Sequence, residues 1–217
     1  ANQKDNVVLY FHNLKFDGSF WIDFLLKAGF KQSYTVIDAE NLEYEWKPNK
    51  FMENNEFKYS ISDRGQWYTI TIKVNGFFIE IRDSLKLLPF SVEKIGKSFG
   101  TKHHKLDMEY TGYRYAGCEI TPKEREYIAN DVLVVKEALE IMFKQGHKKL
   151  TIGSCCLSEF KQLTGKYDYD NFFPDVYDFK IDNNVHGFDN AGQWLLRTYK
   201  GGWCYLVPEK ANKVIHN

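Results

Sequence analysis

An apolar strand that passes through a short polar turn into an amphipathic helix constrains the fold of this chain most. Residues 7–11, VVLYF, have the composition of a buried strand, and His12-Asn13 and the run Phe16-Asp17-Gly18 follow it. Four apolar residues then recur at helical spacing and predict a helix over residues 19–29: Phe20, Trp21, Phe24 and Leu25. Open α/β folds place their ligand sites where strands end. The sequence therefore predicts an α/β fold with a carboxylate, an amide and an aromatic ring at one sheet edge.

Turn and cap residues predict the other elements. Asn75-Gly76 lies between the alternating runs QWYTITIKV and FFIEIRD, a pattern that indicates a β-hairpin with a type I′ turn. Residues 34–38 are expected to form a strand, and the polar segment 39–55 an insertion loop. Thr121-Pro122-Lys123-Glu124 is a capping box with proline at the first helical position. Helices are expected over residues 91–99, 121–145 and about 151–163.

Composition excludes some classes of protein and leaves others open. The chain has 29 basic and 29 acidic residues, so a nucleic-acid-binding surface would have to come from local clustering of charge. Aromatic residues make up 17% of the chain, a surplus that suits a protein that stacks bases. The four cysteines lack CxxC spacing, which is typical of reduced thiols in a cytosolic protein. No signal peptide and no membrane-spanning run is found in the sequence.

Two short motifs resemble those of one enzyme family. NLKFDG, at residues 13–18, resembles the Exo II motif (Asn-x-x-x-Asp) of the 3′–5′ exonuclease domain of protein-primed family B DNA polymerases. These are the replicative enzymes of certain bacteriophages, viruses and linear plasmids. YIAND, at 127–131, resembles the Exo III motif (Tyr-x-x-x-Asp). Further matching stretches follow in the family's order: RGQWY at 64–68, DSLKLLPF at 83–90, HHKLDMEY at 103–110, ITPKEREYIANDV at 120–132 and YKGG at 199–202.

The resemblance covers nearly all 217 residues and implies a ribonuclease-H-like fold, a mixed sheet flanked by helices. It also implies catalytic roles. Asp17 and Asp131 would ligate metal in a two-metal site for Mg²⁺ or Mn²⁺, and Tyr127 would orient the attacking water or the scissile phosphate. Lys105 would stabilise the developing negative charge. Taken alone, each residue favours a structural role: Asp17 as an Asp that caps the helix from its N-terminal side, and Asp131 as a helix-surface residue near a core Tyr127.

The resemblance further implies contacts with a single-stranded 3′ end and with primer-template DNA. Ser84-Leu85 would offer a hydroxyl to phosphate and an apolar wedge. Phe20 would help to hold the primer terminus, and a core aromatic on the amphipathic helix is an equal alternative for it. Tyr199, Gly201 and Gly202 belong to a YxGG loop that connects the exonuclease and polymerase domains and approaches DNA phosphates. The implied DNA contacts are His12, Asn13, Phe16, Phe20, Ser84, Leu85, Tyr110, Tyr199, Gly201 and Gly202. A terminal protein that serves as primer is a further candidate partner.

One expected motif is missing. The family's Exo I pair, Asp-x-Glu on the first strand, should precede Exo II, and no such pair lies upstream of Tyr10. Asp38-Ala39-Glu40 and Asp107-Met108-Glu109 have the spacing but follow Exo II. We therefore expect an exonuclease domain over 1–163 without its first strand, and a connector over 164–217.

Two functional hypotheses remain open for the chain. One is a very weak metal-dependent exonuclease, which is part of a polymerase that proofreads as it synthesises DNA. The other is a non-catalytic module that binds single-stranded DNA or a terminal protein. Either would act in the cytoplasm of a bacterial host and be encoded by a phage, prophage or mobile element, with no membrane partner.

Overall fold

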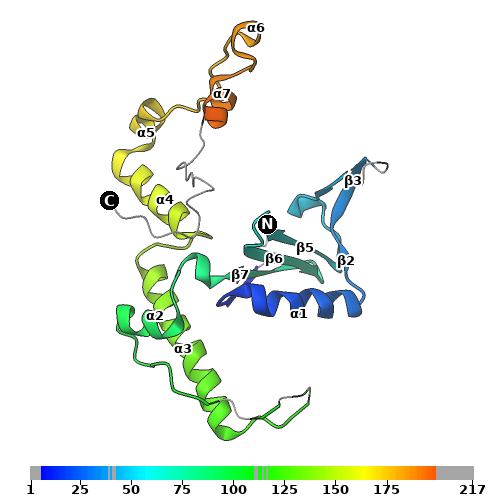
Figure 1. The fold of residues 1–217 in the computed structure, drawn as a ribbon, viewed down its shortest axis with the longest axis vertical. Coiled ribbons are helices and arrows are strands. Elements are labelled where there is room, and N and C mark those ends of the chain that lie inside the picture. The colour runs from blue at the N-terminus through cyan, green and yellow to red at the C-terminus, as the bar shows by residue number, and fades with distance from the viewer. Residues whose placement is uncertain are drawn as a thin grey trace, which may run out of the picture. The chain divides into compact units, whose positions relative to one another are not determined.

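A mixed five-stranded sheet carries the N-terminal part of the fold (Figure 1). The computed structural model describes residues 6–38, 40, 43–109, 112, 113, 115 and 117–198. The strands of the sheet are β1 (Val7–Phe11), β2 (Lys31–Gln32), β5 (Glu56–Ile61), β6 (Trp67–Val74) and β7 (Phe77–Asp83). Their order is β1-β7-β6-β5-β2. The outer pairs, β1 with β7 and β2 with β5, are parallel and the inner pairs are antiparallel, which confirms the predicted mixed sheet.

The β6–β7 hairpin forms where the alternating pattern predicts it. Asn75 and Gly76 both have positive φ, 49° and 78°, as a type I′ turn requires. The pairing Val74↔Phe77 closes the hairpin. β7 then lies between β6 and β1, and its pairing with β1 ends at Phe11↔Asp83. The hairpin thereby brings Asp83 and Ser84 next to the polar turn that follows β1.

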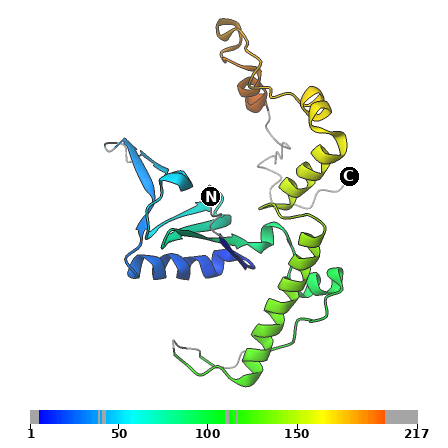
Figure 2. The ribbon, with the colours of Figure 1, turned by 180° about the vertical axis from the view of Figure 1, so that it is seen from behind.

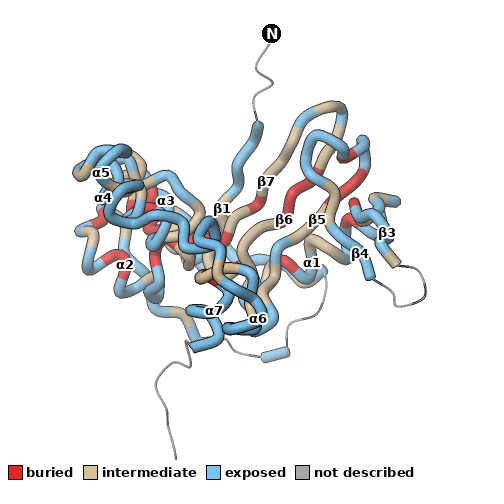
Figure 3. The backbone as a smooth tube through the Cα atoms, turned by 90° about the horizontal axis from the view of Figure 1, so that it is seen from above, coloured by how far each residue is buried: buried red, intermediate tan, exposed pale blue. Residues whose placement is uncertain are grey.

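Two hydrophobic clusters pack on opposite faces of the sheet. Successive residues of a strand point to opposite faces, and Phe11 packs against one cluster while Tyr10 packs against the other. The first cluster lies under α1 (Leu14–Lys27): Leu14, Leu25, Phe57, Ile70, Ile72 and Ile81. The second is built largely from α2 (Val92–Phe99) and α3 (Pro122–Lys144): Leu87, Leu88, Ile95, Val134, Val135, Ala138, Leu139, Met142 and Cys155. Figure 3 shows the buried residues of β6 and β7 and of α3.

Helix α1 begins at Leu14, five residues earlier than predicted. Asn13 precedes it in the left-handed conformation, so Phe16 and Asp17 lie in the first turn rather than in a loop. The buried residues of α1 are Leu14, Gly18 and Leu25, whereas Phe20 and Phe24 are exposed. Half of the expected apolar face is confirmed, since Leu25 is buried and Trp21 packs against the cluster under α1, whereas Phe20 and Phe24 lie on the solvent side of the helix.

The other predicted helices are confirmed. α3 starts with the capping box of Thr121 and Glu124 and ends before Gly146, which has a φ of 89°. Ser91 caps α2, and α4 (Ile152–Thr164) lies where residues 151–163 predicted a helix.

The segment 39–55 is not only a loop. It contains β4 (Glu43–Trp46) and the short 3₁₀ helix η1 (Asn49–Phe51), and β4 pairs with β3 (Tyr34–Asp38) as a separate two-stranded sheet. A second 3₁₀ helix, η2 (Ser84–Lys86), follows β7.

The β3–β4 pair is joined to the main sheet through Glu56, whose carboxylate accepts hydrogen bonds from Ser33 and Lys47, both at 2.8 Å. Burial opposes the charge of Glu56, but the bonds from Lys47, the Glu53 amide and Ser33 outweigh it and lower its pKa.

The chain divides into two units, Ala1–Leu157 and Ser158–Asn217, and the boundary lies inside α4. The segment expected as a connector contains three short helices, drawn in yellow to orange in Figures 1 and 2: α5 (Lys166–Phe172), α6 (Asn183–His186) and α7 (Ala191–Thr198). Cys118, Cys155 and Cys156 are free thiols, and Cys204 lies outside the described residues. Within the described ranges, no helix combines the length and apolarity needed to cross a bilayer.

Replacement of Gly18 by alanine tests how closely α1 packs on the sheet. A Cβ at this buried position would lie 2.6 Å from Cε3 of Trp67, so α1 or the indole must shift. We expect Gly18→Ala to lower the free energy of unfolding by about 1–3 kcal/mol despite the better helix propensity of alanine. Urea denaturation measures the change. Gly153→Ala is the matched control, since nothing lies within 4 Å of its Cβ position; equal effects at both positions would contradict the tight packing.

Candidate functional site

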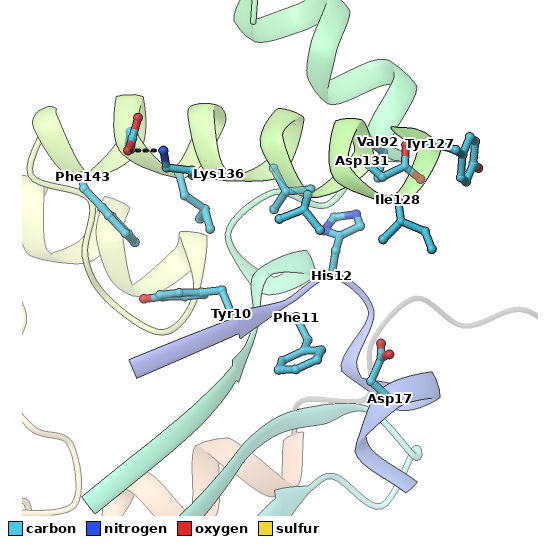
Figure 4. Close-up of a pocket in the computed structure, with 14 residues that line it drawn as sticks. Tyr10, Phe11, His12, Asp17, Val92, Tyr127, Ile128, Asp131, Lys136 and Phe143 are labelled. Atoms are coloured by element: carbon cyan, nitrogen blue, oxygen red, sulfur yellow. Dashed lines mark ion pairs between the residues drawn. The ribbon is translucent and has the colours of Figure 1, made fainter. Parts of the chain in front are cut away.

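A pocket of about 800 Å³ lies between the end of β1, the first turn of α1 and one side of α3. Figure 4 shows its two walls, with Tyr10, Phe11, His12 and Asp17 on one side and the side chains of α3 on the other. Asp17 and Asp131, predicted as a pair from positions far apart in sequence, both line it. Figure 4 also shows the Asp17 carboxylate directed from α1 toward the wall that carries Asp131.

The carboxylate of Asp83 shapes the wall formed by β1 and α1. Its Oδ1 accepts hydrogen bonds from the backbone N–H groups of Asn13 and Leu85, both at 3.0 Å. Asp83 is only 3% exposed, so these bonds are protected from water. Asn13 has a φ of 67° and a ψ of 60°, a conformation that asparagine tolerates better than most residues. Asp83 therefore holds the turn that sets where α1 begins.

His12 and Ser84 have structural partners. The Ser84 hydroxyl is fully buried and donates to the Phe11 carbonyl at 3.1 Å. The ring of His12 lies 3.1 Å from that hydroxyl through Nδ1 and 2.8 Å from the Phe90 carbonyl through Nε2. A carbonyl only accepts, so Nε2 carries the proton in that bond. In this structure the Ser84 hydroxyl is therefore buried and paired within the protein, and its contact with phosphate stays a prediction.

On the opposite wall, α3 brings Tyr127 and Asp131 to the pocket. Lys105 reaches this wall from the segment after α2, with its Nζ 3.9 Å from Oδ2 of Asp131 and 5.8 Å from the centre of the Tyr127 ring. The other oxygen of Asp131, Oδ1, is buried and has no hydrogen-bond partner among the described residues. The neighbours of Asp131 on α3, Ile128 and Val132, are exposed and line the pocket, so Asp131 lies on the pocket side of the helix and not on its core-facing side.

Two phenylalanines beside Asp17 are open to solvent. Phe16 is 70% exposed and Phe20 is 76% exposed, so neither belongs to the core. Phe20 and Asp17 also line a second, smaller pocket of about 310 Å³. The core alternative for Phe20 was wrong, and aromatic faces are accessible next to the carboxylate. Leu85, the expected wedge, is half-buried.

A metal would find part of a coordination shell here. The unpartnered Oδ1 of Asp131 and the carboxylate of Asp17 suit a hard divalent cation. However, no group of three or more His, Cys, Asp or Glu side chains within the described ranges is arranged to hold a metal. Of the two substitute pairs, Asp107 and Glu109 line a different pocket with Lys123, and Asp38 ends β3. The two carboxylates alone do not complete a two-metal site.

Four predicted DNA contacts lie outside the described residues: Tyr110, Tyr199, Gly201 and Gly202. In contrast, Asp83 was not singled out from the sequence. An aspartate at the end of a strand and directly before Ser84-Leu85 has the position of a cap, and its side chain indeed caps η2. Its cap position could have identified Asp83 from the sequence, although its bond to Asn13 depends on the β1–β7 pairing.

Comparison with known proteins relates the chain to phage enzymes. The family model described as DNA polymerase type B, organellar and viral, matches residues 2–210. The DNA polymerase of Bacillus phage B103 is 37% identical over 95% of this chain and 32% of its own length. For that of Bacillus phage phi29 the identity is 38% over 88% of this chain and 32% of its own length. The chain thus spans about a third of the length of these relatives.

Solved structures agree with the sequence relatives. Phi29 DNA polymerase with primer-template DNA superposes with a TM-score of 0.69 at 34% identity, over 95% of this chain and 33% of that one. The same polymerase with single-stranded DNA gives a TM-score of 0.68 at 34% identity, over 93% of this chain and 32% of that one. The predicted fold class, a mixed sheet flanked by helices, is confirmed.

Removal of the Asp83 carboxylate should loosen the β1–α1 turn. Asp83→Ala leaves two N–H groups without an acceptor, and a buried unpaired donor costs about 1–3 kcal/mol. We expect a loss of at least about 2 kcal/mol in urea denaturation. Asp83→Asn keeps an acceptor oxygen and should lose less. The control is Asp23→Ala on the exposed side of α1, where the carboxylate pairs with Lys27 at 2.7 Å. An Asp83→Ala variant as stable as this control would refute the role.

Proposed function

Because this chain belongs to the type B DNA polymerases of organelles and viruses, we propose that it forms the 3′–5′ exonuclease region of a protein-primed DNA polymerase. One observation carries the proposal. A single pocket is lined by Asp17 from α1 and by Tyr127 and Asp131 from α3, the residues of the Exo II and Exo III motifs. The longer protein would synthesise DNA and remove mismatched nucleotides from single-stranded 3′ ends.

The proposed substrate is a single-stranded DNA 3′ end. A phi29 polymerase of similar fold has been solved with single-stranded DNA and with primer-template DNA, and we extend both kinds of ligand to this chain. The exposed rings of Phe16 and Phe20 offer stacking surfaces beside Asp17. The chain has no net charge, so stacking rather than bulk electrostatics would provide most of the affinity.

The proposed chemistry is phosphodiester hydrolysis. Lys105 would place its ammonium near the scissile phosphate, where a positive charge stabilises the pentavalent transition state. Tyr127, whose ring lies under that ammonium, would orient the phosphate or the attacking water through its hydroxyl. Asp17 and Asp131 would be the ligands for Mg²⁺ or Mn²⁺, which would supply an activated water and stabilise the leaving oxygen.

A second function, single-stranded DNA binding without catalysis, is favoured by a specific observation. Within the described ranges, no group of three or more His, Cys, Asp or Glu side chains is arranged to hold a metal, while the exposed phenylalanines need no metal to stack on bases. Asn13, Tyr110, Tyr199, Gly201 and Gly202 are proposed as further DNA contacts. A terminal protein primer is the proposed protein partner, and the cytoplasm of a bacterial host is the proposed place of action.

The chain should be a very weak nuclease. Loss of one transition-state contact commonly lowers a rate by about 10²–10³, and an incomplete metal shell removes more than one. We expect at most trace release of nucleotides from a labelled single-stranded oligonucleotide in Mg²⁺ or Mn²⁺. The site would be complete if nucleotides were released rapidly and if both EDTA and Asp131→Ala abolished the release. The control variant Asp23→Ala should not affect it.

Single-stranded DNA binding should depend on the exposed phenylalanines. Phe16→Ala and Phe20→Ala should each weaken binding of a short oligonucleotide by about 1–3 kcal/mol, the cost of losing one stacked base. Fluorescence anisotropy measures the affinity. Phe51→Ala provides the control, because Phe51 is comparably exposed, at 61%, but lies on η1.

Equal binding by the parent chain and by all three alanine variants would exclude Phe16 and Phe20 as stacking residues. Circular dichroism of each variant separates lost binding from lost folding.

A further inference from the structure

Lys105 lies on a segment that has no helix or strand of its own. Residues 103–109 follow α2 without regular secondary structure, and Lys105 itself is exposed. A long lysine side chain on such a segment loses much conformational entropy when it is held in one place. Something else must therefore hold the backbone if its Nζ is to stay beside Asp131.

Glu137 of α3 supplies that hold. Its Oε2 accepts hydrogen bonds from the backbone N–H groups of Lys102 at 2.6 Å and of His103 at 3.3 Å. Its Oε1 lies 2.5 Å from Nδ1 of the His103 ring. Three contacts thus converge on one carboxylate. The hydrogen bond from His103 and those from the two backbone amides lower the pKa of Glu137 and keep it ionised at neutral pH.

Thr101 secures the same segment from the side of α2. It is buried, its N–H donates to the Gly96 carbonyl at 3.2 Å, and its hydroxyl donates to the His103 carbonyl at 2.7 Å. The absence of a side chain at Gly96 leaves this space, because a Cβ there would lie 3.3 Å from the Thr101 hydroxyl. The backbone of His103 is therefore bound through both its N–H and its C=O.

We propose that Glu137 and His103 form a clamp that positions Lys105 beside Asp131 and Tyr127. Glu137 and Asp131 belong to the same helix, so the carboxylate that holds the segment is fixed relative to the one that Lys105 approaches. Only one residue, His104, lies between the clamped His103 and Lys105, which leaves little freedom in between. Glu137 and His103 are positioning residues that touch neither DNA nor metal, and their role at the site rests on the proposed function.

Limited trypsin digestion of the full chain tests the clamp without DNA. Glu137→Ala should speed cleavage after Lys102 and Lys105 by about tenfold or more, since bonds to an ionised carboxylate restrain the segment. His103→Ala, which keeps the bonds to the backbone, should give a smaller increase. Glu45→Ala removes the same charge from an exposed position on β4 and should leave both sites unchanged. Mass spectrometry identifies the cut sites; unchanged cleavage in Glu137→Ala overturns the clamp.

The salt dependence of oligonucleotide binding tests the positioning. One phosphate contact on a single strand contributes about 0.7 to the slope of log K against log salt concentration. Lys105→Ala and Glu137→Ala should flatten the slope by the same amount, and the double variant by no more than either. Lys27→Ala serves as the charge control on an exposed lysine. If Glu137→Ala impairs folding, Glu137→Gln retains the shape of the side chain and should give an intermediate effect.

The two measurements separate the possible failures. In one outcome, Glu137→Ala is cleaved faster but keeps the salt slope of the parent chain, while Lys105→Ala flattens that slope. This outcome gives Glu137 a purely structural role and overturns the positioning. No effect of Lys105→Ala on the slope overturns the proposed phosphate contact and the positioning with it, whereas the digestion still reports whether the segment is clamped.

Discussion

The buried carboxylate of Asp83 is the contact on which the geometry of the pocket depends. It joins the end of β7 to the turn after β1 by accepting the Asn13 N–H group, and it caps η2 by accepting that of Leu85. Ser84 adds a bond to the Phe11 carbonyl, so two adjacent residues fix the whole β1–α1 junction. Where α1 begins decides which way Asp17 points. The carboxylate of Asp83, which does not line the pocket, thus determines the direction of the Asp17 carboxylate, which does.

Helix α3 serves two purposes along its length. Its later turns bury Val134, Ala138 and Met142 in the cluster shared with α2, which anchors the helix to the sheet. Its earlier turns leave Ile128 and Val132 exposed along the pocket, with Asp131 between them. Because one rigid helix carries both parts, the packing at one end fixes the position of the carboxylate at the other. Ile128 and Val132 place apolar surface beside Asp131, which strengthens the attraction of Lys105.

The electrostatics of the site separate anchoring from chemistry. Glu137 satisfies its charge with two backbone amides and the ring of His103, and Glu56 satisfies its own with Lys47 and Ser33. Asp131 is different, since Lys105 is 3.9 Å away and Oδ1 has no hydrogen-bond partner in the described part of the chain. A carboxylate oxygen that is buried and unpaired costs stability. Such a cost is typical of groups that a ligand or metal completes.

Local patterns determined much of the fold from the sequence alone. Asn75-Gly76 specified the hairpin, and Thr121 and Glu124 specified the start of α3, because turns and caps depend on residues a few positions apart. The grouping of Asp17 with Asp131 followed from family resemblance and could not follow from spacing. Only the tertiary structure decided that α1 starts at Leu14, that Ser84 is buried, and that Phe16 and Phe20 face solvent. The first two depend on contacts across the β1–β7 pairing, between residues some seventy positions apart, and the third depends on which face of α1 packs on the sheet. Local sequence encodes neither.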